Sequence, residues 1–194
     1  PLRCRMTRTV VLESHDDWDG WRAAARALVA EGVPPEAVTW QVGPGATDLF
    51  GGAPVAAITR PTFGVPRDFV DLARSAILHR DPERFALLHG LLVRVLDQPM
   101  ALHDRSDPRT RKVVAMAQTV RRDLHKMRAF VRFRDIDGHH VAWFEPDHHI
   151  LRANAGFFIG RFATMRWSIL TPDASIHWDG ATLREGPGAT RAAA

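Results

Sequence analysis

Apolar residues recur at helical spacing in four stretches of the first 130 residues, and a capping residue or a proline precedes each stretch. Ser14 suits the N-cap of the first helix, which Gly32 would end. The next three helices are introduced by Pro66, Asp81-Pro82 and Asp107-Pro108. The pattern therefore predicts a helical layer between about residues 66 and 127.

Extended segments precede this helical layer. "TRTVVLES" (7–14) is rich in β-branched residues, and a second strand is expected at Val38 to Val42. "PVAAITRP" (54–61) is a candidate third strand. The glycine- and proline-rich segment before it lacks the spacing of phosphate-binding loops, so we interpret it as a connector.

From residue 130 the apolar period changes to two, which is typical of strands. Phe130, Arg132 and Arg134 would share one strand face. Asp137-Gly138 is a hairpin signal, and a returning strand follows it at 139–145. A helix is expected over 146–165 and a second hairpin, turning at Pro172-Asp173, over 166–180.

These elements predict an α+β fold, with N-terminal and central helices packed with a largely antiparallel sheet that contains a ββαββ unit. We expect a single domain from 8 to 185. Residues 1–7 are expected to be disordered or to precede the true start, and 186–194 to form a linker-like tail.

Composition excludes several classes of protein. The single cysteine, Cys4, rules out an internal disulfide framework and a four-cysteine metal or iron–sulfur site. No apolar run is long enough to span a membrane, and no cofactor motif is present. We therefore expect a cytoplasmic bacterial protein that does not insert into membranes.

The net charge of +4 is unevenly distributed along the chain. Residues 103–135 hold ten Lys and Arg against four Asp, a net of +6, so the rest of the chain sums to −2. Such a segment can attract a polyanion. Of the 26 cationic residues, 24 are Arg, an excess that GC-rich coding would also produce.

The helix that follows Pro108 places apolar residues on one arc and cations on the other. Together with the strand expected after it, the cations and one aromatic ring would form a surface for single-stranded or damaged DNA. The predicted nucleic-acid-binding residues are Arg121, Arg122, Lys126, Phe130, Arg132 and Arg134. The alternative is an ordinary solvated face of an amphipathic helix.

Histidines and carboxylates crowd the junction after the returning strand. His125, Glu145, His148 and His149 are weak candidates for an acid–base cluster, and the catalytic residues remain unknown. No HxxxH or HxH spacing supports a metal site, so none is assigned. Asp147 can instead serve as the N-cap of a helix that begins at His148.

Several stretches carry a family resemblance that covers about residues 8–188. "RDPERFALLHGLL", "VRRDLHKMRAFVRFR", "VAWFEPDHHILRANAGFF", "RFATMRWSILTPD" and "HWDG" resemble a bacterial domain of unknown function known as a probable DNA metabolism protein. That domain stands N-terminal to UdgX-type uracil-DNA glycosylases or occurs beside a radical-SAM protein. The resemblance implies a role beside uracil-DNA recognition, without established catalytic residues to transfer.

The chain departs from this family pattern at its C-terminal end. It contains no tyrosine, whereas family members continue with a tyrosine-rich segment, and it lacks the cysteines of the glycosylase iron–sulfur cluster. Uracil excision is therefore not expected. Three hypotheses remain: a DNA-binding or docking module for DNA repair, a metal-dependent or acid–base enzyme acting on nucleic acid, and an interaction domain for a glycosylase or radical-SAM partner.

Overall fold

The structure is a computed structural model, and it describes residues 7–43 and 63–191. The chain divides into two compact units at residue 118, within its longest helix. Unit 1 covers residues 1–118 and unit 2 covers 119–194. The expected single domain from 8 to 185 stays a prediction, because compactness does not tell whether each unit folds independently.

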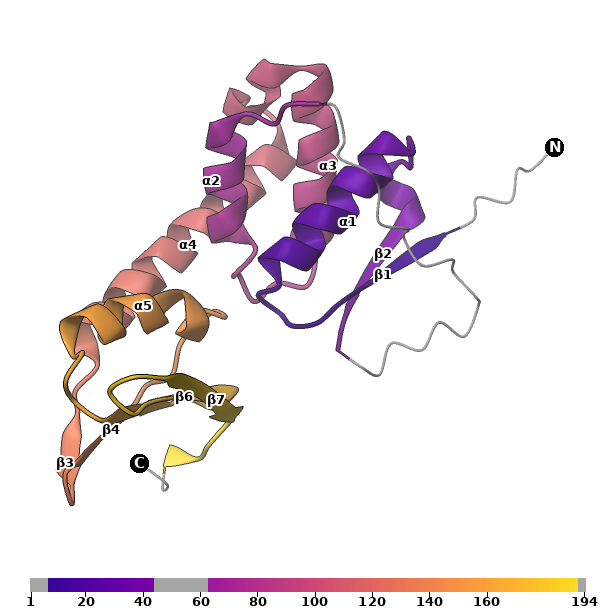
Figure 1. The fold of residues 1–194 in the computed structure, drawn as a ribbon. Helices are drawn as coiled ribbons and strands as arrows, with labels where there is room; N and C mark the ends of the chain where they lie inside the picture. Colours follow the sequence, from indigo (N-terminus) through magenta and orange to yellow (C-terminus); the bar gives the residue numbers. More distant parts are fainter. Residues whose placement is uncertain (1–6, 44–62, 192–194) are drawn as a thin grey trace. The chain divides into compact units, whose positions relative to one another are not determined.

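Unit 1 begins with a parallel β–α–β arrangement (Figure 1). Strand β1 (Arg8–Leu12) pairs with β2 (Val38–Val42). Helix α1 (Trp18–Ala30) and the short 3-10 helix η1 (Pro35–Ala37) connect them. Ser14 does not cap α1, contrary to the prediction. Asp17 caps it, because its Oδ1 accepts the backbone N–H of Gly20 at 2.8 Å.

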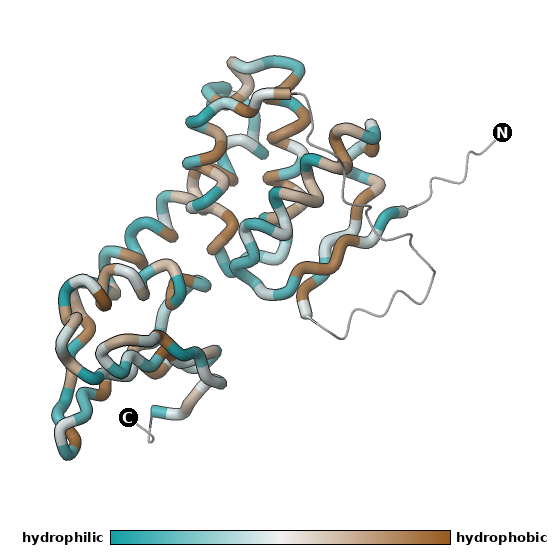
Figure 2. Tube along the Cα trace, viewed as in Figure 1, coloured by the Kyte–Doolittle hydropathy of each residue, from teal (hydrophilic) through white to brown (hydrophobic). Residues whose placement is uncertain are grey.

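The helical layer predicted from the sequence is confirmed. It comprises α2 (Arg67–Ala76), α3 (Arg84–Asp97), the 3-10 helix η2 (Pro99–His103) and α4 (Pro108–Phe130). In Figure 2 apolar and polar positions alternate along α4, as expected of a helix with one buried arc. None of the helices in the described residues is long and apolar enough to cross a membrane.

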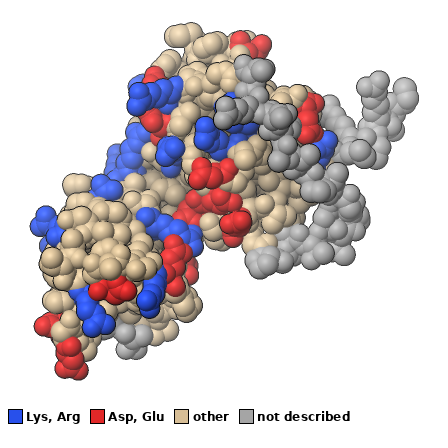
Figure 3. Space-filling model, viewed as in Figure 1, with Lys and Arg blue, Asp and Glu red and all other residues tan. Residues whose placement is uncertain are grey.

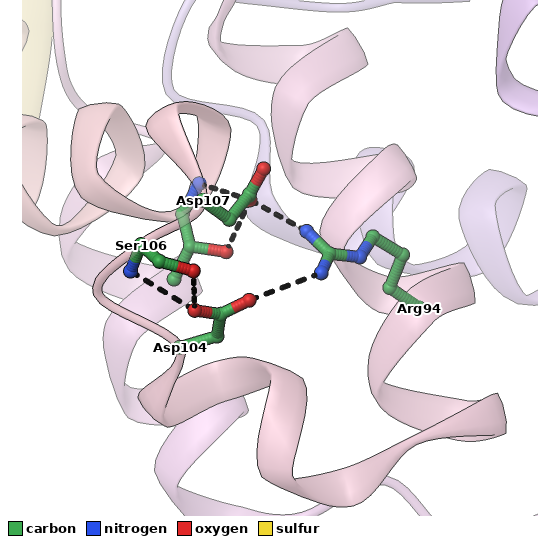
Figure 4. A network of polar contacts seen from close by, with 5 residues as sticks. Arg94, Asp104, Ser106 and Asp107 are labelled. Atoms are coloured by element: carbon green, nitrogen blue, oxygen red, sulfur yellow. Dashed lines mark hydrogen bonds and ion pairs between the residues drawn. The ribbon is translucent and has the colours of Figure 1, made fainter.

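Asp107 caps α4, as the sequence predicts. Its Oδ2 accepts the backbone N–H and the hydroxyl of Thr110, at 2.8 and 2.7 Å. Arg94 of α3 reaches the same carboxylate at 2.5 Å and lies 3.6 Å from Asp104, whose Oδ1 accepts from Ser106 (Figure 4). The hydrogen bonds from Thr110, followed by the charge of Arg94, hold the pKa of Asp107 below its usual value. The start of α4 is therefore joined to α3 within unit 1.

Unit 2 contains a five-stranded mixed sheet in the order β3-β4-β5-β6-β7. Its strands are β3 (Arg134–Ile136), β4 (His139–Trp143), β5 (Trp167–Leu170), β6 (Ala174–Trp178) and β7 (Leu183–Pro187). Only β4 and β5 pair in parallel, with α5 (Leu151–Arg161) as their crossover. The α+β class and the largely antiparallel sheet are confirmed.

An aromatic cluster joins α5 to one face of this sheet. Phe158 of α5 packs against Trp167 of β5, with ring centroids 6.2 Å apart, and Phe133 lies 6.1 Å from the same indole. Trp178 of β6 donates its Nε1 hydrogen to the carbonyl of Ala163, just after α5. The core of unit 2 therefore lies between α5 and this face.

Two strand predictions need correction. The expected strand through Phe130 does not form, since α4 continues to that residue and β3 begins only at Arg134. The segment 186–194 was expected to be a tail, but Gly186 and Pro187 belong to β7. The hairpin turns at Asp137-Gly138 and Pro172-Asp173 are confirmed. The strand proposed for 54–61 lies outside the described residues.

Candidate nucleic-acid interface

The second half of α4 carries a row of exposed side chains. Arg122, Lys126 and Phe130 follow one another at intervals of four residues, which places them on one stripe of the helix. We call these three residues the α4 row. Phe130 is 66% exposed, which is unusual for a large apolar side chain and leaves its ring available to a partner. Two cations and an aromatic ring therefore lie along the same line.

The opposite arc of the same helix is buried, which fixes the orientation of the α4 row. Val120, Asp123 and Met127 are buried, while Arg121 and His125 are exposed beside the row. Figure 3, which shows one face of the molecule, has Lys and Arg side chains over this part of α4. The predicted division of this helix into an apolar arc and a cationic arc is confirmed.

The expected strand face of Phe130, Arg132 and Arg134 is wrong, because these residues belong to different elements. Arg132 donates through Nη1 to the carbonyls of Ala129 and Val131, at 2.7 and 3.0 Å. It thus satisfies carbonyl groups at the end of α4, as a cation at a helix C-terminus is expected to do. Arg134 is exposed on the edge strand β3.

Two more cations of this region make side-chain contacts. Lys126 lies 3.3 Å from Asp147, and both side chains are at least half exposed. Arg128 donates to Asn154 of α5 at 2.7 Å and lies over the ring of Phe157. An exposed ion pair contributes little to stability, so Lys126 can exchange its carboxylate for a phosphate at small cost. Arg128, by contrast, is committed to α5.

The turn before α5 is organised by Asp123. Its buried carboxylate accepts the backbone N–H of His148 at 3.0 Å. Helix α5 begins at Leu151, and Ile150 occupies its N-cap position without a capping side chain. The prediction that Asp147 caps a helix starting at His148 is therefore wrong. A carboxylate from α4 binds the turn instead.

The proposed acid–base cluster finds little support in these positions. His125 is exposed on α4, whereas His148 is a buried residue of the turn that Asp123 holds. Glu145 accepts the indole hydrogen of Trp143 at 2.8 Å, and His149 is half-buried. Within residues 7–43 and 63–191, no three His, Cys, Asp or Glu side chains gather in a group that could hold a metal ion. The acid–base role stays a hypothesis.

A polar network that sequence reasoning missed crosses the centre of the sheet. His139 Nε2 and His177 Nδ1 each lie 2.7 Å from the hydroxyl oxygen of Ser168. The other ring nitrogen of His177 lies 2.9 Å from the hydroxyl of Ser175. Both serines are buried and both imidazoles are half-buried. Four polar side chains from β4, β5 and β6 therefore form one chain of hydrogen bonds.

This network is satisfied while both imidazoles are neutral. If Ser175 donates to His177, then His177 donates to Ser168, and Ser168 donates to His139; the reverse direction is equally consistent. Burial lowers the pKa of His177, and the neighbouring His139 lowers it further. A neutral His177 at pH 7 follows. The only sequence signal was the alternation Ser175-x-His177, and finding the network required knowing which strands are neighbours.

Comparison with known protein families gives one match. The model of a domain of unknown function, DUF4130, matches residues 82–186, which include all of α4 and the sheet strands almost to the end of β7. No curated protein and no solved structure matches the chain. The matched segment covers more than half of the sequence. The chain therefore belongs to the DUF4130 family.

Proposed function

We propose that this chain is an accessory module of DNA metabolism that binds single-stranded DNA through unit 2. The observation that carries the proposal is the α4 row, in which Arg122 and Lys126 precede the exposed ring of Phe130 on one stripe of a helix. Proteins that bind single strands combine cations, which neutralise phosphates, with rings on which bases stack. The α4 row offers both.

The neighbouring cations extend this surface. Arg121 is exposed beside the row, and Arg132 and Arg134 follow it in the chain. Arg132 uses Nη1 for helix carbonyls, which leaves the other guanidinium nitrogens for phosphate oxygens. If about five cations contact phosphates, the logarithm of the affinity should fall with the logarithm of salt concentration with a slope near −3.5.

The resemblance noted in the sequence supports a setting for this binding. Its relatives stand beside UdgX-type uracil-DNA glycosylases or radical-SAM proteins, so the module would hold DNA for a partner that does the chemistry. On this proposal the DNA is single-stranded or damaged, because an exposed ring needs an unstacked base. The catalytic step belongs to the partner.

Binding of a fluorescent single-stranded oligonucleotide at several salt concentrations tests the proposal. Arg122→Glu combined with Lys126→Glu should weaken binding by more than tenfold at low salt and flatten the salt slope by about 1.4. The matched control is Arg22→Glu with Arg67→Glu, two exposed arginines of unit 1, because it changes the net charge by the same amount. Equal loss in both double variants would refute an interface on α4.

A further inference from the structure

The strand register sorts the residues of the five-stranded sheet onto two faces. One face packs against α5, as the contact between Phe158 and Trp167 shows. Among the described residues of unit 2, α5 is the only helix that packs closely on this sheet. We call the other face the network face; its residues are Arg134, Ile136, His139, Val141, Trp143, Ser168, Leu170, Ser175, His177, Arg184 and Gly186.

Charge divides sharply between the two faces. None of the strand residues on the network face is acidic, whereas Asp135 and Glu185 both belong to the opposite face. Arg134 and Arg184 lie on the two edge strands, β3 and β7, and both are exposed. The face thus has a cation at each side, which suits a chain of phosphates.

The nearest carboxylates lie in the adjoining loops and are already engaged. Glu145 accepts from Trp143, and Asp179 accepts the backbone N–H groups of Ala181 and Thr182 while lying 3.6 Å from Arg184. Their hydrogen bonds point them at loop backbone and at the end of β4. Glu145 therefore places one carboxylate at the edge of the Trp143 ring, while the strand residues at the centre of the network face carry no negative charge.

At the centre of the network face, half-buried aromatic rings lie next to buried serine hydroxyl groups. Trp143, His139 and His177 are half-buried, and Ser168 and Ser175 beneath them are 5% and 3% exposed. The serine hydroxyls hold both imidazoles in fixed orientations, so little conformational entropy is lost when a partner binds. Rings held in this way are suitable platforms for nucleic-acid bases.

Gly186 of β7 supplies the space that this arrangement needs. A Cβ atom at this position would lie 2.6 Å from the hydroxyl oxygen of Ser175 and 3.2 Å from Nε2 of His177. Any larger residue would therefore displace the hydroxyl that orients His177. The hydrogen-bond network of Ser175 and His177 therefore requires a glycine at position 186.

We propose that the network face binds the bases of a single-stranded nucleic acid, with Trp143 and the two imidazoles contacting bases and the edge arginines contacting phosphates. This inference rests on the proposed function, because it assumes that unit 2 binds a single strand. It adds a second surface to the α4 row. That surface distinguishes bases from a bare sugar–phosphate backbone.

Two probes separate base contacts from phosphate contacts: an oligothymidylate of about ten nucleotides and an abasic oligomer of equal length. Trp143→Leu should weaken binding of the oligothymidylate by about 5- to 100-fold and leave the abasic oligomer within about twofold. Trp143→Phe keeps a ring and should restore most of the difference. The matched control is Trp178→Leu, a half-buried indole on the opposite face.

The outcomes distinguish the two proposals. If Arg122→Glu with Lys126→Glu abolishes binding while Trp143→Leu binds both oligomers as the wild type does, the network face is not a base-binding surface and the α4 proposal stands. If Trp143→Leu removes the preference for bases while the α4 variant keeps its salt slope, the inference stands and the α4 proposal fails. Equal effects of Trp143→Leu and Trp178→Leu overturn the inference. So does sedimentation showing that the wild type self-associates through this face and Trp143→Leu does not.

Discussion

The carboxylate of Asp123, on α4, accepts the backbone N–H of His148 across 25 residues of sequence, at 3.0 Å. Asp123 is 3% exposed, and its Oδ1 has no hydrogen-bond partner. Burial raises the pKa of this carboxyl group, while hydrogen bonds from the turn backbone oppose the rise. The turn that leads into α5 is therefore fixed by a buried acid on the helix that carries the α4 row.

Replacing Asp123 separates its hydrogen bonds from its charge. Asp123→Ala leaves the backbone N–H of His148 without its acceptor and should lower the free energy of unfolding by about 1 to 3 kcal/mol. Asp123→Asn keeps an acceptor and should stay within about 1 kcal/mol of the wild type at pH 7. Urea unfolding measures both. Equal destabilisation by Ala and Asn would show that the charge, and not the acceptor, matters.

The pH dependence of the Asn variant provides an independent check on Asp123. Because the folded-state pKa is raised, the stability contributed by the protonated carboxyl is present below the unfolded value of about 3.8 and is lost as pH rises through the folded value. The free energy of unfolding of the wild type should therefore increase relative to that of Asp123→Asn as pH is lowered towards 4. A difference between the two proteins that does not change with pH would contradict the raised pKa.

Arg84 should be the most sensitive polar residue of unit 1. It is 1% exposed and donates to the carbonyls of Ile77, Asp81 and His15 at 2.7, 3.0 and 2.7 Å. Burial lowers its pKa to about 10, so it remains charged at neutral pH. Arg84→Met would leave these carbonyls without their donor, and we expect a loss of about 3 kcal/mol in chemical denaturation.

Arg109→Met is a suitable control for Arg84, since Arg109 is an exposed arginine of unit 1 and the substitution removes the same charge. Its cost should stay below about 0.5 kcal/mol. Arg84→Lys should recover only part of the lost stability, because an ammonium group cannot reach three carbonyls in the geometry of a guanidinium. Full recovery by Lys would mean that charge alone is required.

The sequence predicted those parts of the molecule that depend on local signals. Asp107 and Pro108 identify the start of α4, and the Asp137-Gly138 hairpin follows from the left-handed φ values that this pair accepts. The predicted end of α4, at Met127, is three residues too early. No glycine or proline between Met127 and Val131 marks the boundary between helix and strand, so the sequence does not locate it. The alternation of apolar residues after Ala129 suits a strand as well as the last helical turn.

The candidate sites divide in the same way. The cationic arc of α4 could be predicted, because helical spacing places Arg122 and Lys126 on one side of the helix. The position of Phe130 in the same row could not, because the change of apolar period assigned Phe130 to a strand whereas α4 continues to it. The network face could not, since His139 and Ser168 meet only through the parallel pairing of β4 with β5 across α5. Sequence spacing carries no information about which strands become neighbours.

His89 should make unit 1 sensitive to acid. Its side chain is fully buried, neither ring nitrogen has a hydrogen-bond partner, and burial lowers its pKa to about 4. The unfolded chain, with a pKa near 6.5, therefore binds a proton that the folded chain rejects between about pH 6.5 and 4. Stability is full above this window and should fall by up to about 3 kcal/mol as pH is lowered through it.

His89→Leu isolates this contribution from the other titrating groups. The variant has no imidazole to protonate at position 89, so between pH 6.5 and 4 it should lose up to about 3 kcal/mol less stability than the wild type, while the other groups titrate equally in both proteins. It also removes two unsatisfied nitrogens and should be at least as stable as the wild type at pH 7. If the free energies of unfolding of the two proteins change with pH in parallel, a buried neutral His89 is not the cause of the acid sensitivity.

Asp147 should restrain DNA binding through its ion pair with Lys126. The two groups lie 3.3 Å apart, and both are exposed, so a phosphate must compete with the carboxylate for the ammonium group. Asp147→Asn removes that competition and one negative charge beside the α4 row, and it should tighten binding by about two- to fivefold at low salt. The gain should vanish near 1 M salt, where charges are screened within about 3 Å.

Asp97→Asn is the control for Asp147→Asn. It lies at an exposed position in unit 1, changes the net charge equally and should leave the affinity unchanged. Weaker binding by Asp147→Asn would mean that the pair positions Lys126 for phosphate and does not compete for it.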